Sequence, residues 1–265
     1  MITCTGASYN VFNGEEHLVQ SVRNIRPCVD YINIVVQYIS NQGLPAQSTL
    51  RDAIDELSNN KLVDEIIEYT PDFGKTPVEN ELEKRNIGLF HAKKASVSHF
   101  ITMDSDEFYP RDEFDQAKFL INLKGYQSTS VHTYLHIKRP IYRSAIPDTT
   151  CCSFLTKIES ESMIHYDDYY PVVVDPTRRL HGRRESFHQF SPETVSMRHM
   201  NLVRRDLAWK LKNSTNAQAT EFMQRVQKAF EDWQFGDLLN FPNKPPLQII
   251  QVDDLFDLDS RFRGS

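Results

Sequence analysis

The chain has 265 residues, of which 40% are hydrophobic, and a formal net charge of -6. This length suits one large α/β domain with a sizeable core. The mild acidity argues against a nucleic-acid-binding protein, which would carry a basic stripe. No apolar stretch is long enough to span a bilayer, so we expect no integral membrane segment. The cysteines (Cys4, Cys28, Cys151 and Cys152) form no CxxC pair, which indicates reduced thiols in a cytoplasmic protein, soluble or peripheral to a membrane.

In the first half of the chain, strand patterns alternate with helix patterns. We predict strands at residues 1–5, 31–38 and 63–69 and in a run that ends at Asp104, and helices at 15–26, 48–57 and 77–94. Residues 31–38 are almost continuously apolar, which is typical of a strand buried on both faces of a parallel sheet. The alternation predicts an α/β fold in which helices flank a doubly wound, mostly parallel sheet with right-handed crossovers.

Beyond Gly125 the pattern changes. Longer strands are predicted at 128–138 and 151–158, a short strand at 169–174, and helices at 203–212 and 217–233. We expect this half to add partly antiparallel strands to the same sheet. From residue 241 a tail that contains three prolines is predicted to wrap over the surface.

The most informative pattern is an apolar run that ends in an acidic cluster. Residues 99–103 (HFITM) lead directly into Asp104, Ser105, Asp106 and Glu107. Two carboxylates one residue apart repel each other, and burying them without compensation would be costly. A divalent cation removes that cost, and oxygen ligands at the end of a rigid strand suit Mg²⁺ or Mn²⁺. Because such an ion keeps positions for water or phosphates, the cluster predicts a site for a phosphorylated substrate, most simply a nucleotide.

Ligands of open α/β sheets bind at the carboxyl ends of the strands, near the switch point of the strand order. There we expect a polar loop at residues 6–10, in which Tyr9 stacks on a base while Gly6 and Ala7 allow close approach. Gly6 equally fits a turn with no further role. Gln37 ends the second strand and meets the same edge.

A helix that precedes the acidic cluster carries Arg85 and Asn86. A guanidinium group and a side-chain amide suit the recognition of a diphosphate or a ribose. The alternative is a solvated helix face on which Arg85 pairs with Glu81 or Glu83.

These segments, in this order, carry a resemblance. The loop after the first strand, EKRNIGLFHAKKA (83–95) and FITMDSDEFY (100–109) resemble the nucleotide-sugar half of the family-2-like GT-A glycosyltransferases. In that superfamily an Arg-Asn-x-Gly helix leads into the strand that bears the Asp-x-Asp motif. The resemblance implies a GT-A, Rossmann-like fold, and a Mn²⁺ or Mg²⁺ ion held at Asp104 and Asp106, of which Asp106 is the more direct ligand. It also implies nucleotide-sugar contacts by Thr5, Gly6, Ala7, Tyr9, Gln37, Arg85, Asn86, Asp104, Ser105 and Lys212.

One position departs from the resemblance. Many family-2-like members carry an acidic residue just after the second strand, where this chain has Gln37. A glutamine still hydrogen-bonds a base or a ribose, so the site of contact is retained while its chemistry differs.

The segment SMRHMNLVRRDLAWKLKNS (196–214) also resembles the superfamily, in which some members supply a third metal ligand from a histidine in the C-terminal half. His199 is expected to take that role, because it stands at the predicted start of a helix with Arg and Lys residues after it. His165, His181 and His188 are alternatives. Lys210 and Lys212 are expected to touch the leaving diphosphate.

Inverting members need a carboxylate base beside the anomeric carbon of the sugar. Asp175, in the segment YYPVVVDPTRRLHGRR (169–184), lies in the region where they carry it, and Asp167 and Asp168 are alternatives. The competing interpretation of Asp175 is a turn residue that caps the backbone. The arginines that follow, Arg178, Arg179, Arg183 and Arg184, either hold an anion or form a solvated basic face.

The resemblance thus implies a metal-dependent, hexosyltransferase-like enzyme of glycan biosynthesis. It would transfer a sugar from a nucleoside-diphosphate sugar, with UDP favoured, to an acceptor hydroxyl of a glycan, lipid-linked sugar or protein, with inversion. Residues 1–110 would bind the donor, 111–240 would complete the metal site and face the acceptor, and 241–265 would form the tail. The alternatives are a sugar nucleotidyltransferase, whose glycine-rich, Arg-containing loop is missing here, and a catalytically silent sugar-binding module.

Overall fold

The computed structural model describes residues 2–180, 186–214 and 220–262. The helices are α1 (Glu15–Ile25), α2 (Ser48–Asn59), α3 (Pro77–Lys94), α4 (Arg111–Lys124), α5 (Leu207–Lys212) and α6 (Thr220–Asp232), with short 3-10 turns η1 (Arg26–Cys28), η2 (Pro176–Arg178) and η4 (Asp259–Arg261). The strands are β1 (Thr5–Val11), β2 (Tyr31–Gln37), β3 (Glu65–Tyr69), β4 (His99–Asp104), β5 (Glu107–Phe108), β6 (Ser128–Ile137), β7 (Arg139–Ser144), β8 (Cys152–Ser153), β9 (Thr156–Lys157), β10 (Phe187–Gln189), β11 (Ser196–Leu202), β12 (Leu238–Leu239) and β13 (Leu247–Gln251).

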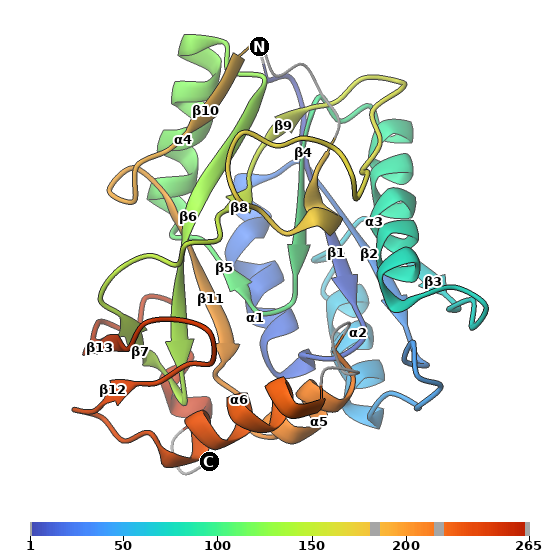
Figure 1. Ribbon diagram of the computed structural model, residues 1–265. Coiled ribbons are helices and arrows are strands. Elements are labelled where there is room, and N and C mark those ends of the chain that lie inside the picture. Colours follow the sequence, from blue (N-terminus) through green and yellow to red (C-terminus); the bar gives the residue numbers. More distant parts are fainter. Residues whose placement is uncertain (1, 181–185, 215–219, 263–265) are drawn as a thin grey trace.

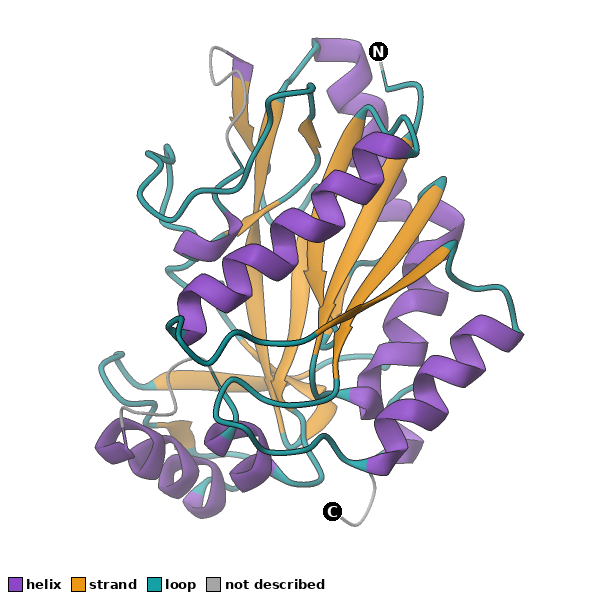
Figure 2. Ribbon diagram, turned by 90° about the vertical axis from the view of Figure 1, so that its right-hand side faces the viewer, coloured by secondary structure: helices purple, strands orange, loops and turns teal. Residues whose placement is uncertain are grey.

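The first sheet has the strand order β3-β2-β1-β4-β9 (Figure 1). The first four strands are parallel, and β9 pairs antiparallel to β4 at the edge. Figure 2 shows helices on both faces of this sheet. The prediction of a mostly parallel α/β sheet flanked by helices is confirmed. Because the strand order reverses between β1 and β4, the switch point lies where the acidic cluster follows β4.

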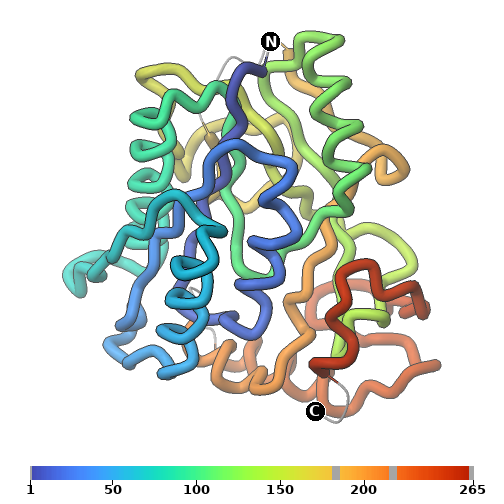
Figure 3. The backbone as a smooth tube through the Cα atoms, turned by 180° about the vertical axis from the view of Figure 1, so that it is seen from behind, coloured from blue at the N-terminus to red at the C-terminus, as the bar shows by residue number. Residues whose placement is uncertain are grey.

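Helices α1 and α2 cover one face of the sheet, as the view from behind shows (Figure 3), and their apolar residues share a core with β1 and β2. Helix α3 packs on the other face. A Cβ atom at Gly88 of α3 would overlap the hydroxyl of Ser8 and lie 2.9 Å from its Cβ atom. A Cβ atom at Gly6 would lie 2.7 Å from a methyl carbon of Val97. Small residues are therefore required where helix and sheet approach closely.

This packing corrects the first predicted strand. Strand β1 runs from Thr5 to Val11 rather than over residues 1–5, and the expected polar loop at 6–10 is its buried centre. Its small and polar residues indicated a loop, but they serve the close contact with α3. The turn that follows β1 lies at residues 12–14, where Gly14 has a φ of 84° and precedes α1.

The second half forms a second sheet, with the order β12-β13-β7-β6-β11-β5, and β8 and β10 also pair with β6. The expected continuation of the first sheet is wrong except for β9. The predicted strand at 151–158 is divided into β8 and β9, which lie in different sheets. Residues 169–174 form no strand and contribute only an isolated bridge between Val174 and Cys151. In the predicted tail, β13 pairs with β7 and extends the second sheet.

The helices of the second half also differ from the prediction. Helix α5 begins at Leu207 rather than at residue 203, since Asp206 caps it by accepting a hydrogen bond from the N–H of Trp209, and Ser196–Leu202 is strand β11. Residues 217–219 of the expected last helix lie outside the described residues, and α6 accounts for 220–232. Helix α4 was not predicted. Within the described ranges, each helix is too short or too polar to cross a bilayer.

Candidate functional site

A cavity of about 780 Å³ opens at the carboxyl ends of β1, β2 and β4, beside α5 and η2. It brings together eight residues that the sequence analysis singled out: Gln37, Asp104, Ser105, Asp106, Asp175, Arg179, His199 and Lys210. It adds polar residues that the sequence analysis did not single out, among them Asn10, Asn13, Lys84, Asn201 and Arg204. We call this cavity the main pocket.

Asp104 ends β4, and its carboxylate accepts hydrogen bonds from two guanidinium groups. Nη2 of Arg85 lies 3.0 Å from Oδ1 and 3.3 Å from Oδ2, and Nη2 of Arg178 lies 2.5 Å from Oδ2. Burial alone would raise the pKa of Asp104, but Arg178 and Arg85 outweigh burial and lower it. Both oxygens of this carboxylate therefore already have cationic partners.

Arg178 also binds Glu107, the last residue of the acidic cluster. Its guanidinium lies 2.5 Å from Oε1 and 3.0 Å from Oε2 of Glu107. Both side chains are buried, and burial raises the pKa of Glu107 although Arg178 opposes the shift. Oε2 also accepts a hydrogen bond from the backbone N–H of Asp104, which fixes the turn after β4.

Asp106 is buried and faces a different pair of cations. Arg204 and Lys210 both donate to its Oδ2, with Lys210 Nζ at 3.3 Å. Burial would raise the pKa of Asp106, but Lys210, Arg204 and His199 together hold it well below its ordinary value of 3.8. Lys210 also donates to the carbonyl of Asn201, which connects α5 to the end of β11.

The other oxygen of Asp106 faces His199, whose Nε2 lies 3.6 Å from Oδ1. Two ligands of one octahedral ion, each about 2.1 Å from it, lie about 3 Å apart when adjacent and about 4 Å apart when opposite. The separation of these two atoms is between those values. Both side chains line the main pocket, but their separation matches neither arrangement, so one of them would have to shift to hold an octahedral ion together with the other.

The metal prediction is supported by fewer ligands than expected. Among residues 2–180, 186–214 and 220–262, no group of three or more His, Cys, Asp or Glu side chains is arranged to hold a metal ion. Of the three predicted ligands, Asp106 and His199 lie close to each other, and Asp104 is engaged by arginines. His199 lies within β11, opposite Glu107 of β5, and does not begin a helix as expected.

The prediction that the acidic cluster needs a metal ion to compensate its negative charge is also wrong. Four cationic side chains, Arg85, Arg178, Arg204 and Lys210, already surround its three carboxylates. The carboxylates are thus already compensated by side chains. Phosphate oxygens and water would have to complete the coordination of an ion bound here.

Four predicted nucleotide contacts lie in β1, away from the pocket. Thr5, Ala7 and Tyr9 are fully buried, and the hydroxyl group of Tyr9 is 2.9 Å from Oγ of Ser21. Gly6 lies against Val97 beneath α3. The expected stacking of Tyr9 on a base is therefore wrong in this structure, and Asn10 and Asn13 occupy the pocket edge instead.

The predicted contacts of α3 also turn inward. The Arg85 guanidinium is buried and binds Thr102 and Glu81 besides Asp104, so the predicted pair with Glu81 is present. Both amide atoms of Asn86 bind the backbone of Ile164, which holds the 159–165 segment onto the helix. From this helix, Glu81 and Lys84 line the pocket.

The remaining predicted contacts divide between the pocket and the surface. In the pocket, the Gln37 side chain donates to the carbonyl of Ile39 at 2.6 Å and to Oδ1 of Asn41 at 3.1 Å. The Ser105 hydroxyl donates to the carbonyl of Asn13 at 3.0 Å. Lys212 is exposed and does not line the cavity.

Asp175 lines the pocket and also caps η2, accepting hydrogen bonds from the N–H and the hydroxyl of Thr177, both at 2.8 Å. The interpretation of Asp175 as a residue that caps the backbone is therefore confirmed, and its role as a base stays a prediction. Asp167 and Asp168 do not line the cavity. His165 and His188 also lie elsewhere, and His181, Arg183 and Arg184 fall outside the described residues.

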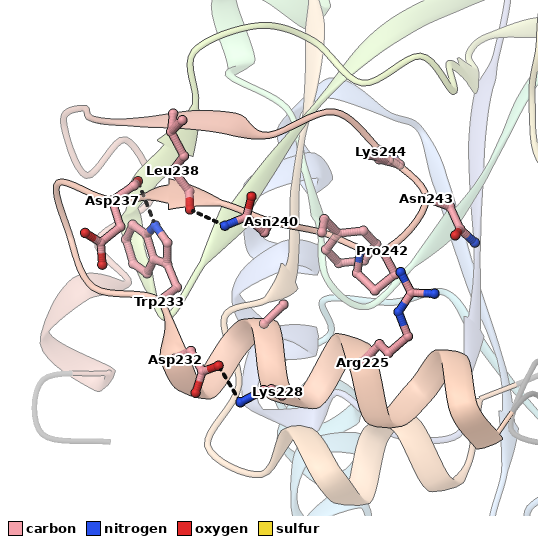
Figure 4. Close-up of a pocket in the computed structure, with 12 residues that line it drawn as sticks. Arg225, Lys228, Asp232, Trp233, Asp237, Leu238, Asn240, Pro242, Asn243 and Lys244 are labelled. Atoms are coloured by element: carbon pink, nitrogen blue, oxygen red, sulfur yellow. Dashed lines mark hydrogen bonds and ion pairs between the residues drawn. The ribbon is translucent and has the colours of Figure 1, made fainter.

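Another cavity, of about 740 Å³, lies between α6 and the segment of residues 237–244 (Figure 4). Trp233 donates from its indole to the carbonyl of Asp237, and Lys228 pairs with Asp232 on its rim. None of the predicted site residues lines this cavity.

Some solved structures are similar to this chain at low identity. S. aureus TarS is 10% identical over 86% of this chain and 43% of that chain, with a TM-score of 0.43. S. aureus TarS 1-349 in complex with UDP is 12% identical over 56% and 39%, with a TM-score of 0.38. GalNAc-T7 with UDP, GalNAc and Mn²⁺ is 8% identical over 89% and 52%, with a TM-score of 0.41. The chain spans about half or less of each of these chains. No protein-family model and no curated protein matches it.

Proposed function

We propose that this protein is a glycosyltransferase that moves a sugar from a nucleoside-diphosphate sugar, with UDP favoured, to an acceptor hydroxyl, with inversion and with a divalent ion. One observation carries the proposal. The Asp106–His199 pair lies in a pocket of about 780 Å³ at the carboxyl ends of parallel strands, with Arg204 and Lys210 beside it. Cations and a metal-ligand pair at a strand switch point suit a bound diphosphate.

In this proposal Asp106 Oδ1 and His199 Nε2 hold Mn²⁺ or Mg²⁺, and Asp104 orients the guanidinium groups of Arg85 and Arg178. The ion, when bound, stabilises negative charge on the departing diphosphate. Lys210 contributes to the same stabilisation, because its ammonium lies within the pocket, 3.3 Å from Asp106. Because this ammonium is already held by Asp106 and by the carbonyl of Asn201, it needs little reorganisation as charge develops, which is the condition for effective electrostatic catalysis.

Asp175 is the proposed base for the acceptor hydroxyl. Its carboxylate is exposed at the pocket wall, and its two hydrogen bonds from Thr177 fix its orientation. A proton accepted there leaves the hydroxyl oxygen free to attack the anomeric carbon as the diphosphate departs. The pocket has one wall from residues 10–106 and another from 150–214, which supports a donor half (1–110) and an acceptor half (111–240).

The test is incubation with a panel of nucleotide sugars and Mn²⁺, with detection of released nucleoside diphosphate and of sugar attached to an acceptor. His199→Gln should lower turnover on the order of 100-fold or more, as removal of comparable electrostatic elements does. It should also weaken binding of Mn²⁺ together with UDP in calorimetry, which does not depend on turnover. Asp106→Ala is a poorer test, because it leaves Arg204 and Lys210 unpaired inside the protein.

His91→Gln is the matched control. His91 is paired with Glu65 and does not line the pocket, so this variant should keep full activity. Full turnover in excess chelator would contradict the metal part of the proposal. Release of inorganic pyrophosphate from a nucleoside triphosphate and a sugar phosphate would instead indicate a nucleotidyltransferase. Donor binding with neither reaction would indicate a silent sugar-binding module.

A further inference from the structure

A small cavity of about 140 Å³ lies on the second sheet, outside the main pocket. Its lining includes Arg143, Arg198 and His136, together with Asp253 and Phe256 from the segment that follows β13. Two guanidinium groups and an imidazole around one small cavity are an unusual lining, because partly buried charges are normally paired.

The strand register explains why these side chains meet. Tyr134 and His136 are two apart on β6, so they project from the same face of the sheet. Arg198 of β11 is opposite Tyr134, and Arg143 of β7 is opposite His136. The Arg143 guanidinium lies 4.2 Å from the centre of the Tyr134 ring, and that of Arg198 lies 5.5 Å from it. Two positively charged guanidinium groups thus lie near the same Tyr134 ring.

Arg143 is the unpaired member of this cluster. Arg198 is bound to Glu113 at 2.9 Å, whereas Arg143 makes no ion pair with any residue that the structure describes, and its buried Nε has no hydrogen-bond partner there. Asp253 is the carboxylate on the cavity wall, and it is exposed. Burial lowers the pKa of Arg143, and the neighbouring Arg198 adds to the shift.

His136 presents a hydrogen-bond acceptor. Its Nδ1 lies 2.6 Å from the carbonyl oxygen of Pro140, and since a carbonyl only accepts, Nδ1 carries the hydrogen. Burial lowers the pKa of His136 to about 3, so the ring is neutral near pH 7 and Nε2 keeps its lone pair. Nε2 is buried and without a partner within the described part of the chain. It therefore needs an N–H or O–H donor.

We propose that this cavity binds a small oxyanion that also carries a hydroxyl group, such as hydrogen phosphate or a small α-hydroxycarboxylate. The negative oxygens pair with Arg143 and Arg198, and the hydroxyl donates to Nε2 of His136. Sulfate and acetate have the charge but no hydroxyl at neutral pH, so they leave the imidazole unsatisfied. The cavity is separate from the main pocket, because Arg198 and His199 are consecutive on β11 and consecutive strand residues point to opposite faces.

The experiment uses the full chain at pH 7 and constant ionic strength, with thermal unfolding and calorimetry in millimolar phosphate, sulfate, glycolate or acetate. Phosphate or glycolate should raise the unfolding midpoint in a saturable way. The hydroxyl-bearing anion should bind about tenfold or more tightly than its partner without the hydroxyl, since a buried acceptor left unpaired weakens binding. The phosphate–sulfate and glycolate–acetate pairs distinguish the two sources of this chemistry.

Arg143→Met should abolish the response, and it should fold, because Arg143 makes no hydrogen bond or ion pair among the described residues that the substitution would break. Arg51→Met is the matched control, since Arg51 also lies over a tyrosine ring (Tyr38, 4.0 Å) but outside this cavity. An equal response of Arg143→Met and the unaltered protein would overturn the site. Equal binding of phosphate and sulfate would overturn the assignment of the hydroxyl group to His136.

Discussion

Arg178 is the side chain on which the acidic cluster depends most. Its guanidinium contacts both Asp104 and Glu107, and it is 5% exposed. Replacement by methionine keeps much of the volume but removes the charge. Asp104 retains Arg85, whereas Glu107, whose side chain is 2% exposed, has no other cationic ion-pair partner among the residues that the structure describes. The substitution therefore leaves one buried carboxylate without a counter-charge.

The magnitude follows from that unpaired carboxylate. Removal of one partner from a buried ion pair costs about 3–5 kcal/mol, a large part of the roughly 5–15 kcal/mol that stabilises a typical domain. With a urea m-value of about 3 kcal/mol/M, Arg178→Met should lower the unfolding midpoint by about 1–1.7 M. Arg178→Met combined with Glu107→Gln should recover much of the loss, because the remaining amide is neutral.

Urea unfolding followed by far-UV circular dichroism measures these midpoints. Arg23→Met is the control, because Arg23 pairs with Glu56 while both side chains are more than 40% exposed. Such a pair contributes at most about 1 kcal/mol. Equal losses in Arg178→Met and Arg23→Met, or a double variant whose losses simply add, would refute the argument that Glu107 is stabilised by Arg178.

Two further predictions concern packing and acid stability. Gly88→Ala should lower the free energy of unfolding by about 1–3 kcal/mol, because the new methyl group overlaps Ser8. Ser8→Gly in the same chain should restore part of that free energy. Unchanged midpoints of urea unfolding would contradict this close contact. The pKa of Asp106 is lower in the folded state than its ordinary value of 3.8. The stability that ionised Asp106 contributes is therefore complete at pH values above 3.8, and it disappears as the pH falls through the folded-state pKa. The free energy of unfolding should therefore fall on acidification between about pH 5 and pH 1, and Asp106→Asn should make that fall less steep.

The architecture of the first half could be predicted because its signals are local. The continuous apolar run of β2 and the capping box of α3, in which Thr76 and Glu79 bind each other's backbone N–H, are encoded in neighbouring residues. The bounds of β1 could not be predicted in this way. Gly6 and Ser8 are usual in turns, and they lie in a strand because Val97 and Gly88, more than 75 positions away, pack against them. No local pattern records that contact.

The candidate site, too, could be predicted from the sequence only where its residues are neighbours along the chain. The acidic cluster was singled out because its residues are consecutive and follow an apolar strand, and His199 because basic residues follow it; the metal role of His199 stays a prediction. The partners of these residues come from distant segments: Arg178 is 74 positions from Asp104, and Arg204 is 98 positions from Asp106. The basic patch at 178–179 was visible, but its sequence did not reveal that one arginine is buried against the cluster while the next lines the pocket.

Charge compensation by side chains changes what the acidic cluster implies. If carboxylates at a strand end had no cationic neighbours, folding itself would require an ion there. In this protein Arg85, Arg178, Arg204 and Lys210 already balance three carboxylates, so the cluster is stable whether or not an ion is bound. An ion that arrives then gains little from the protein's charge and must gain from its other ligands. Under the proposed function a diphosphate would provide them, and metal and substrate affinities would then depend on each other at the Asp106–His199 pair.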